Sequence, residues 1–219
     1  MDLFTYYRST ASYRVRIALA LKGLEVHAVP VNLSRGVAEQ RLPSYLALNP
    51  QGRVPALGLE GGHVLTQSSA IIEYLEERFP EPALLPAMSA HHYDSQCLLA
   101  RAKHREVAAL IACDIHPLHN LSVLERLRAL GRGEDDVNAW IRHWITEGLS
   151  NVEALIGDTD FCFGDVGLAD VYLLPQVYAA RRFDADLRAF PRIRRVEALA
   201  LQHKAFQTAH PNAQSDTPE

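Results

Sequence analysis

The pattern of hydrophobic and polar positions changes its period at about residue 85. Before that point, short apolar runs alternate with helical patterns, which is typical of a small α/β domain. Strands are predicted at residues 3–7, 26–31, 54–59 and 63–65. Three helices are predicted: the first ends at Lys22, and the other two cover residues 35–48 and 67–79. Only the last two strands are joined by a tight turn, Gly61-Gly62, so the order βαβαββα predicts a mixed sheet.

Beyond a proline-punctuated stretch with Pro80, Pro82 and Pro86, every pattern has the helical period. Helices are predicted over residues 91–117, 122–130, 135–156, 168–181 and 192–208, with no strand. We therefore expect an α/β domain over 1–83, a linker over 84–90 and an all-helical domain over 91–219. The polar tail from His210 is expected to be mobile.

Composition narrows the class of protein further. The chain of 219 residues is 48% hydrophobic and 22% charged, with a net charge of −4, so no basic field favours nucleic acid. Its three cysteines, Cys97, Cys113 and Cys162, are odd in number and far apart, which argues against a disulfide framework. We find no signal-peptide pattern and expect no apolar stretch long enough to span a bilayer. A cytoplasmic protein is expected.

The start of the first helix carries the strongest chemical signal. Ser9, Thr10 and Ser12 crowd a helix N-terminus, where backbone N–H groups lack partners and the macrodipole is positive. Such a place stabilises an anion. Ala11 stands where a thiol nucleophile could have been, so a thiolate held here must come from the ligand.

Two further features of this domain suit a small peptide-like anion. If the bond between Val54 and Pro55 is cis, the backbone N–H and C=O of Val54 are free to pair with an extended ligand; a trans proline at a strand edge is the alternative. Gln67 and Ser68 begin the next helix and can either cap it or bind an amino-acid carboxylate. Their order and spacing strengthen the ligand-binding interpretation.

In the helical half, several clusters have ordinary structural explanations. His116 and His119 could suggest a metal site, but Pro117 interrupts the helix that would align two ligands, so we expect no metal and a polar wall instead. The pair His91-His92 is expected to be solvated. Trp140, Ile141 and Trp144 are expected in the core, and Arg192, Arg194 and Arg195 on the exposed face of the last helix.

The chain resembles the glutathione transferase superfamily, and within it the zeta class, which contains the maleylacetoacetate and maleylpyruvate isomerases. The resemblance runs from Leu3 to about Pro211, with a tail Ser215-Asp216-Thr217-Pro218. It is carried by residues 8–19, Ala47-Leu48-Asn49-Pro50, Gln67-Ser68 with 70–77, residues 115–122, Leu174-Pro175-Gln176-Val177 and Arg182-Phe183. It implies an N-terminal thioredoxin-like βαβαββα domain followed by a helical domain.

The resemblance also implies roles. Ser9 would hydrogen-bond the glutathione sulfur, beside Thr10, Ala11, Ser12, Tyr13 and Arg14. Gln67 and Ser68 would hold the γ-glutamyl end, Val54 the cysteinyl backbone and Gln40 the glycyl end. His116, Asn120, Leu121 and Ser122 would line the far wall, and Arg8 and Arg182 would face a dicarboxylate substrate. Arg14 and Arg16 could equally be solvated or ion-paired helix arginines.

Three positions depart from the family pattern. Ala11 replaces a cysteine, which leaves the chemistry intact if the attacking sulfur belongs to glutathione. His116 replaces a glutamine and is a feature of maleylpyruvate isomerases. Gly167 replaces the serine or threonine that usually caps the helix beginning at Leu168, at a cost of a few tenths of a kcal/mol.

The activity implied is glutathione-dependent cis–trans isomerisation of maleylpyruvate or maleylacetoacetate in aromatic-compound catabolism, by a homodimer. Two alternatives stay open: a transferase or dehalogenase acting on small α-halo acids, and a non-catalytic glutathione-binding module.

Overall fold

The computed structural model describes residues 1–88 and 94–218 and divides the chain into two compact units. Unit 1 combines residues 1–83 with 202–219, and unit 2 comprises residues 84–201. The end of the chain, expected in the helical domain, therefore belongs to unit 1. Leu84 and Leu85, expected in a linker, are buried and belong to unit 2. The pair His91-His92 lies outside the described residues.

Unit 1 is built on a four-stranded mixed sheet. Its strands are β1 (Asp2–Thr5), β2 (His27–Pro30), β3 (Ala56–Gly58) and β4 (Val64–Thr66), in the order β2-β1-β3-β4. β1 pairs parallel with β2, and β3 pairs antiparallel with both β1 and β4. The predicted mixed sheet is confirmed, with one hairpin between β3 and β4.

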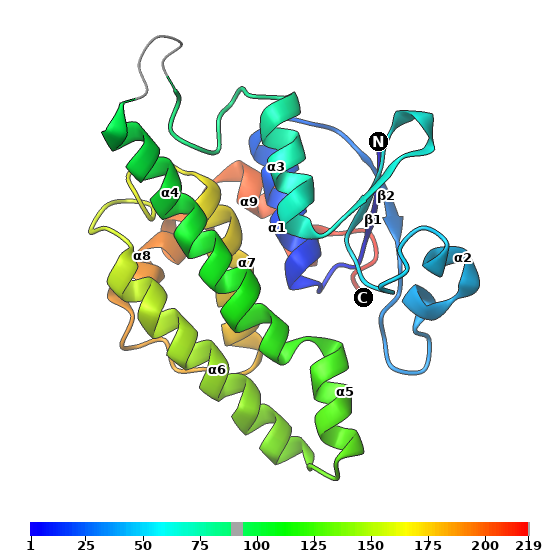
Figure 1. Ribbon diagram of the computed structural model, residues 1–219. Helices are drawn as coiled ribbons and strands as arrows, with labels where there is room; N and C mark the ends of the chain where they lie inside the picture. Colours follow the sequence, from blue (N-terminus) through cyan, green and yellow to red (C-terminus); the bar gives the residue numbers. More distant parts are fainter. Residues whose placement is uncertain (89–93, 219) are drawn as a thin grey trace. The chain divides into compact units, whose positions relative to one another are not determined.

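Helices cover both faces of this sheet. α1 (Thr10–Leu21) and α3 (Ser68–Arg78) lie on one side, and α2 (Pro43–Leu46) lies on the other (Figure 1). The helix predicted over 35–48 is mostly absent: only the 3₁₀ turn Glu39–Arg41 and α2 form there. Ala38 has a left-handed φ of 50°, and Leu42 is extended because a proline follows it.

The C-terminal segment packs against α1. The helix predicted over 192–208 ends at Ala200, and α9 (Lys204–Ala209) forms after a turn, with Phe206 1% exposed. The tail beyond it is ordered: the Thr217 hydroxyl donates to the Pro211 carbonyl at 2.6 Å, and the Tyr7 N–H donates to the Asp216 carboxylate at 2.8 Å. The expectation of a mobile tail is therefore wrong.

Unit 2 is helical, as predicted. Its helices are α4 (Ser95–Ala109), α5 (Leu121–Ala129), α6 (Glu134–Leu155), α7 (Leu168–Arg182) and α8 (Pro191–Ala200) (Figure 1). A π-helical turn, Leu110–Ile115, and a 3₁₀ turn, His116–His119, connect α4 to α5. Ile141 belongs to the core as expected, whereas Trp140 and Trp144 are half-buried.

The segment Ser95–Ala129 corrects one expectation. By length and composition alone, this helical stretch is apolar enough to cross a membrane, although no such stretch was expected. In the structure the stretch changes helix type three times, from α to π to 3₁₀ and back to α, and contains Pro117. Val107, Ile111 and Ile115 are fully buried in it, as in the core helix of a globular unit.

The start of α7 explains the departure at Gly167. Nδ1 of His104, on α4, accepts a hydrogen bond from the Ala169 N–H at 3.3 Å and so takes the place of a capping hydroxyl. The buried Asp170 carboxylate accepts from the N–H groups of Gly167 and Cys162, both at 2.9 Å. Burial lowers the pKa of His104 to about 4 and raises that of Asp170. The cap is a neutral imidazole.

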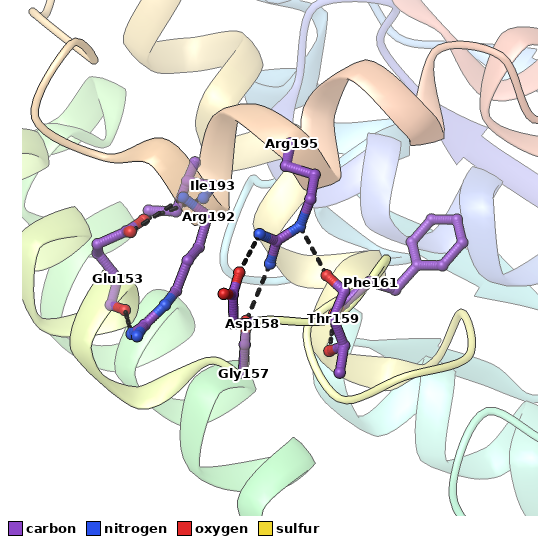
Figure 2. A network of polar contacts seen from close by, with 8 residues as sticks. All are labelled: Glu153, Gly157, Asp158, Thr159, Phe161, Arg192, Ile193 and Arg195. Atoms are coloured by element: carbon purple, nitrogen blue, oxygen red, sulfur yellow. Dashed lines mark hydrogen bonds and ion pairs between the residues drawn. The ribbon is translucent and has the colours of Figure 1, made fainter.

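The arginines of α8 are not simply its exposed face. The Glu153 carboxylate accepts from the N–H groups of Arg192 and Ile193 and so caps the start of α8 (Figure 2). Arg195 donates to the carbonyls of Thr159 and Gly157 and pairs with Asp158. Of the three arginines only Arg194 is exposed, so this cluster joins α8 to the end of α6.

Candidate functional site

A tight turn leads from β1 into α1 and places Ser9. The turn closes with a hydrogen bond from the Ser9 N–H to the Tyr6 carbonyl at 3.0 Å. Ser9 is the N-cap of α1, and its Oγ accepts from the Ser12 N–H at 3.2 Å. Because Oγ is the acceptor in that bond, its own proton is available to an anion at the positive end of the helix.

Arg16 holds this turn from inside the unit. Its guanidinium donates to the carbonyls of Tyr6 and Tyr7, at 3.3 and 2.8 Å, and to that of Ala209 at 3.0 Å. Arg16 is 7% exposed, so the alternative of a solvated helix arginine is wrong. Its role is internal, because four acceptors including Thr5 Oγ1 surround it.

The other predicted residues of α1 differ in their surroundings. Thr10 and Ser12 are buried at the helix start, and Ala11 is half-buried. Arg14 is 2% exposed and donates to Ser68 Oγ at 3.4 Å, which joins the starts of α1 and α3. The Tyr13 ring is buried and packs edge-on against His210. Arg8 is exposed, with its guanidinium 5.7 Å from the Tyr7 ring centre.

The loop before β3 presents backbone groups. The Val54–Pro55 bond is cis, so the trans alternative is wrong. The Arg53 carbonyl is fixed by Tyr45 Oη at 2.6 Å and Asn49 Nδ2 at 2.7 Å. Burial raises the pKa of Tyr45 to about 12, so this phenol stays a donor. Within the described residues, the Val54 N–H and C=O make no hydrogen bond.

Gln40 is buried beside this loop. Its side chain is 6% exposed, and Oε1 has no hydrogen-bond partner among the residues that the structure describes. A Cβ on Gly52, whose φ is +58°, would come 3.0 Å from the Gln40 carbonyl oxygen. Glycine at 52 therefore lets the loop lie directly against Gln40. Buried polar atoms nearly always have a hydrogen-bond partner, so this amide oxygen is available to a ligand or a water molecule.

Gln67 has a strained backbone at the start of α3. It is the N-cap, with φ 71° and ψ 118°, a region that a residue with a side chain seldom adopts. Its Nε2 donates to Gln51 Oε1 at 2.6 Å, and Ser68 behind it is buried. The backbone N–H groups of the first turn of α3 point out of the helix end and can bind a carboxylate.

In unit 2, His116 and His119 stand at the two ends of one 3₁₀ turn. Residues three apart eclipse in a 3₁₀ helix, and the two rings meet at 5.3 Å between centres. His119 is buried and lies 3.3 Å from Oε1 of Gln176, which is fully buried in α7. Trp140 Nε1 donates to the Leu118 carbonyl at 2.7 Å and fixes the same turn.

The preceding π-helical turn depends on Gly148 of α6. A Cβ on Gly148 would lie 2.3 Å from Cγ1 of Ile115, the residue just before His116. No other residue type leaves this space, so Gly148 decides how closely the turn approaches α6.

Arg182 stands at the end of α7. Its guanidinium carbon is 4.3 Å from the centre of the Phe183 ring, and that ring contacts His119 at 6.3 Å. Gln176 and Phe183 are seven residues apart and share one face of α7. Unit 2 therefore links Arg182 and His116 through Phe183 and His119. Asn120 occupies the N-cap position of α5 without a capping hydrogen bond from its side chain, and Leu121 and Ser122 are exposed in the first turn of that helix.

The predicted site residues thus form two sets. Unit 1 holds the set around Ser9, Val54 and Gln67, and unit 2 holds the set around His116 and Arg182. A surface hollow of about 610 Å³ between α7 and α8 contains none of them. Its Arg181 is paired with Glu197 and its Arg195 with Asp158. In the described ranges, no group of three or more His, Cys, Asp or Glu residues is placed to bind a metal.

Sequence reasoning gave no role to several residues that shape these sets. Gln176 could have been noticed as a polar residue inside an otherwise apolar helix. Asp216 belongs to the tail named in the resemblance, but no local pattern indicated its partner Tyr7, which lies near the other end of the chain.

Known proteins resemble this chain in sequence and in structure. Residues 3–83 match the family model for the glutathione S-transferase N-terminal domain. A maleylacetoacetate isomerase of Pseudomonas aeruginosa is 62% identical over 219 residues, covering 100% of this chain and 99% of its own.

Two solved structures are similar over nearly their whole length. The holo structure of a maleylpyruvate isomerase, described as a bacterial zeta-class glutathione S-transferase, has a TM-score of 0.90 and 45% identity, with 100% of both chains covered. A maleylacetoacetate isomerase of Anaeromyxobacter dehalogenans with glutathione bound in its active site has a TM-score of 0.86 and 41% identity, covering 99% of this chain and 97% of that one. The chain therefore belongs to the zeta class of the glutathione S-transferase family.

Proposed function

We propose that this protein is a glutathione-dependent cis–trans isomerase that converts a maleyl keto diacid to its fumaryl isomer. One observation carries this proposal: the hydroxyl of Ser9 caps α1 in a unit without any cysteine, since Cys97, Cys113 and Cys162 all belong to unit 2. An anion cradle without a thiol of its own suits a ligand that brings one.

The residues of unit 1 fit glutathione. Val54 offers an unused N–H and C=O to the cysteinyl backbone, as an edge strand does to a peptide. Gln67 and Ser68 offer the start of α3 to the γ-glutamyl carboxylate, and the buried amide of Gln40 offers a partner to the glycyl end. Glutathione bound in the active site of the relative from A. dehalogenans supports glutathione as the ligand.

When bound, glutathione would supply a thiolate that adds to the conjugated double bond, which becomes a single bond that can rotate; loss of the same thiolate would then re-form the double bond in its trans isomer. Ser9 donates its hydroxyl hydrogen bond to the sulfur, and the α1 N-terminus favours its negative charge. Arg8 and Arg182 bind the two carboxylates of the substrate and stabilise the charge that develops on its carbonyl oxygen. His116, which is linked to Arg182 through His119 and Phe183, contacts the substrate from unit 2. Asn120, Leu121 and Ser122 contact it from the same unit.

Maleylacetoacetate is the substrate that we favour, because the relative with that name is 62% identical, against 45% for the maleylpyruvate isomerase. The histidine at position 116 favours maleylpyruvate instead, because the family resemblance gives a histidine at this position as a feature of maleylpyruvate isomerases. A pocket distinguishes substrates that differ by a methylene by only about 1–3 kcal/mol. The ratio of kcat/KM for the two substrates decides between them.

The test follows the loss of the maleyl absorbance with and without glutathione. We expect turnover only with glutathione and expect Ser9→Ala to lower kcat about 10- to 100-fold, the value of a hydrogen bond to a charged group. Ser69→Ala, at an exposed position of α3, is the matched control and should keep full activity. Equal rates with and without glutathione would contradict the proposal. Release of halide from α-halo acids with no isomerisation would favour the dehalogenase alternative.

We also propose that the enzyme is a cytoplasmic homodimer. Its three cysteines are free, which suits a reducing compartment, and dimers are usual in this family. Light scattering after size exclusion tests the dimer.

A further inference from the structure

The C-terminal tail reaches the turn that places Ser9. The Asp216 carboxylate accepts a hydrogen bond from the Tyr7 N–H at 2.8 Å, across 209 positions of sequence. Tyr7 lies within the turn from Tyr6 to Ser9, whose closing bond joins the Ser9 N–H to the Tyr6 carbonyl. The bond from Asp216 therefore acts on the backbone two residues before the capping serine.

Arg16 links the same turn to the same segment. It donates to the carbonyls of Tyr6 and Tyr7 and also to that of Ala209, the last residue of α9. Asp216 thus binds the N–H of Tyr7 in this turn, and Arg16 binds the carbonyls of Tyr6 and Tyr7. Both connections lead to residues 202–219, which belong to unit 1.

The tail is itself braced, so it can hold a carboxylate in place. Gln214 Nε2 donates to the carbonyls of Thr208 and His210, at 3.0 and 2.9 Å. The Thr217 hydroxyl donates to the Pro211 carbonyl at 2.6 Å. The residues on both sides of Asp216 are therefore tied to the end of α9 and the turn after it.

We propose that Asp216 is a positioning residue for glutathione activation, acting through the Tyr6–Ser9 turn. By fixing the Tyr7 N–H, it keeps the Ser9 hydroxyl at the start of α1, where it donates to the sulfur. This inference rests on the proposed function, because it assumes that Ser9 contacts the thiolate. The C-terminal tail is then part of the support of the sulfur site.

The test measures the pKa of the bound glutathione thiol from its ultraviolet thiolate absorbance. Asp216→Ala removes the acceptor, so we expect a higher thiol pKa and a KM for glutathione raised about tenfold. Asp216→Asn keeps an oxygen that can accept from Tyr7 and is expected to stay within about twofold of the wild type. Asp216→Glu displaces the carboxylate by one methylene. It should raise the thiol pKa and the KM for glutathione in the same direction as Asp216→Ala, by a smaller amount.

Ser215→Ala is the matched control, because Ser215 is exposed beside Asp216 and its side chain takes no part in the bonds that brace the tail. We expect its thiol pKa and its KM for glutathione to stay unchanged. An unchanged thiol pKa in Asp216→Ala and Asp216→Glu, or an equal shift in Ser215→Ala, would overturn the inference. Failure of the proposed function looks different: the wild-type protein would then not lower the pKa of glutathione at all, and the premise of this inference would fall with it.

Discussion

The imidazole of His104 fills the space beside Gly167 that a capping side chain would need. A Cβ built on Gly167 would come 2.6 Å from Cε1 of His104 and 3.0 Å from the Leu84 carbonyl oxygen. The backbone of Gly167 is extended, so glycine is there for space and not for its φ. The start of α7 is therefore capped by a side chain of α4 and not by its own N-cap residue, Gly167.

We therefore expect Gly167→Ser to destabilise the protein, although serine is ordinarily the better cap. Overpacking costs about 1–3 kcal/mol, which exceeds the few tenths that the cap offers. The free energy of unfolding in urea measures this. In the double variant with His104→Ala the loss should be smaller than the sum of the two single losses, because the serine can then cap. A serine variant as stable as the wild type would contradict this account.

His104 also makes stability depend on pH. Its pKa is about 4 in the folded protein and about 6.5 in the unfolded chain, so between these values the unfolded chain binds more protons. Its contribution is complete above pH 6.5 and is lost as the pH falls toward 4, by about 2 kcal/mol at pH 5. His104→Gln, which retains an acceptor, should show a smaller difference in unfolding free energy between pH 7.5 and pH 5. Equal differences in both proteins would remove His104 as the cause.

The Phe183 ring supports Arg182, and its loss should weaken binding of the diacid. A cation–π contact is worth about 0.5–1 kcal/mol at an exposed site, so Phe183→Leu should lower kcat/KM for the maleyl substrate about two- to fivefold. Phe183→Tyr keeps the ring and should behave as the wild type. The KM for glutathione serves as the internal control and should not change. A leucine variant with full activity would show that Arg182 is held by other contacts.

Gly148→Ala should disturb the turn that carries His116. Alanine favours a helix by about 1 kcal/mol over glycine, but its Cβ would overlap Ile115, which costs about 1–3 kcal/mol. We expect lower Tm and a reduced kcat/KM for the maleyl substrate. Combining it with Ile115→Val, which removes the overlapping Cδ1 methyl, should recover part of both. No change in Tm would show that Ile115 moves aside without cost.

The fold was largely predictable because its elements repeat simple periods. The apolar runs predicted as strands at 3–7 and 54–59 overlap β1 (Asp2–Thr5) and β3 (Ala56–Gly58), and the helices of unit 2 follow the 3.6-residue period of their apolar residues. Residues 35–48 failed because the left-handed Ala38 and the proline at 43 interrupt a polar pattern that looked helical. The α8–α9 break and the packing of α9 depend on contacts with distant residues, which no local pattern contains.

The site was predictable only where a local motif carries the chemistry. Ser9 is a helix cap by its position alone, and the structure places it as one. Arg16 and Asp216 have no such local signal, because each is defined by acceptors or donors far along the chain. The replacement of the α7 cap by His104 is also a long-range contact, so sequence could show that Gly167 was unusual but not why.

The order of the units along the chain affects how the protein is made. Unit 2 is one continuous segment, whereas unit 1 joins the first 83 residues to the last segment, 202–219. During synthesis the strands of unit 1 and α1 emerge before unit 2, and α9 and Asp216 emerge after it. Unit 1 therefore completes its packing only after all of unit 2 has been synthesised, whereas unit 2 can fold before α9 is made.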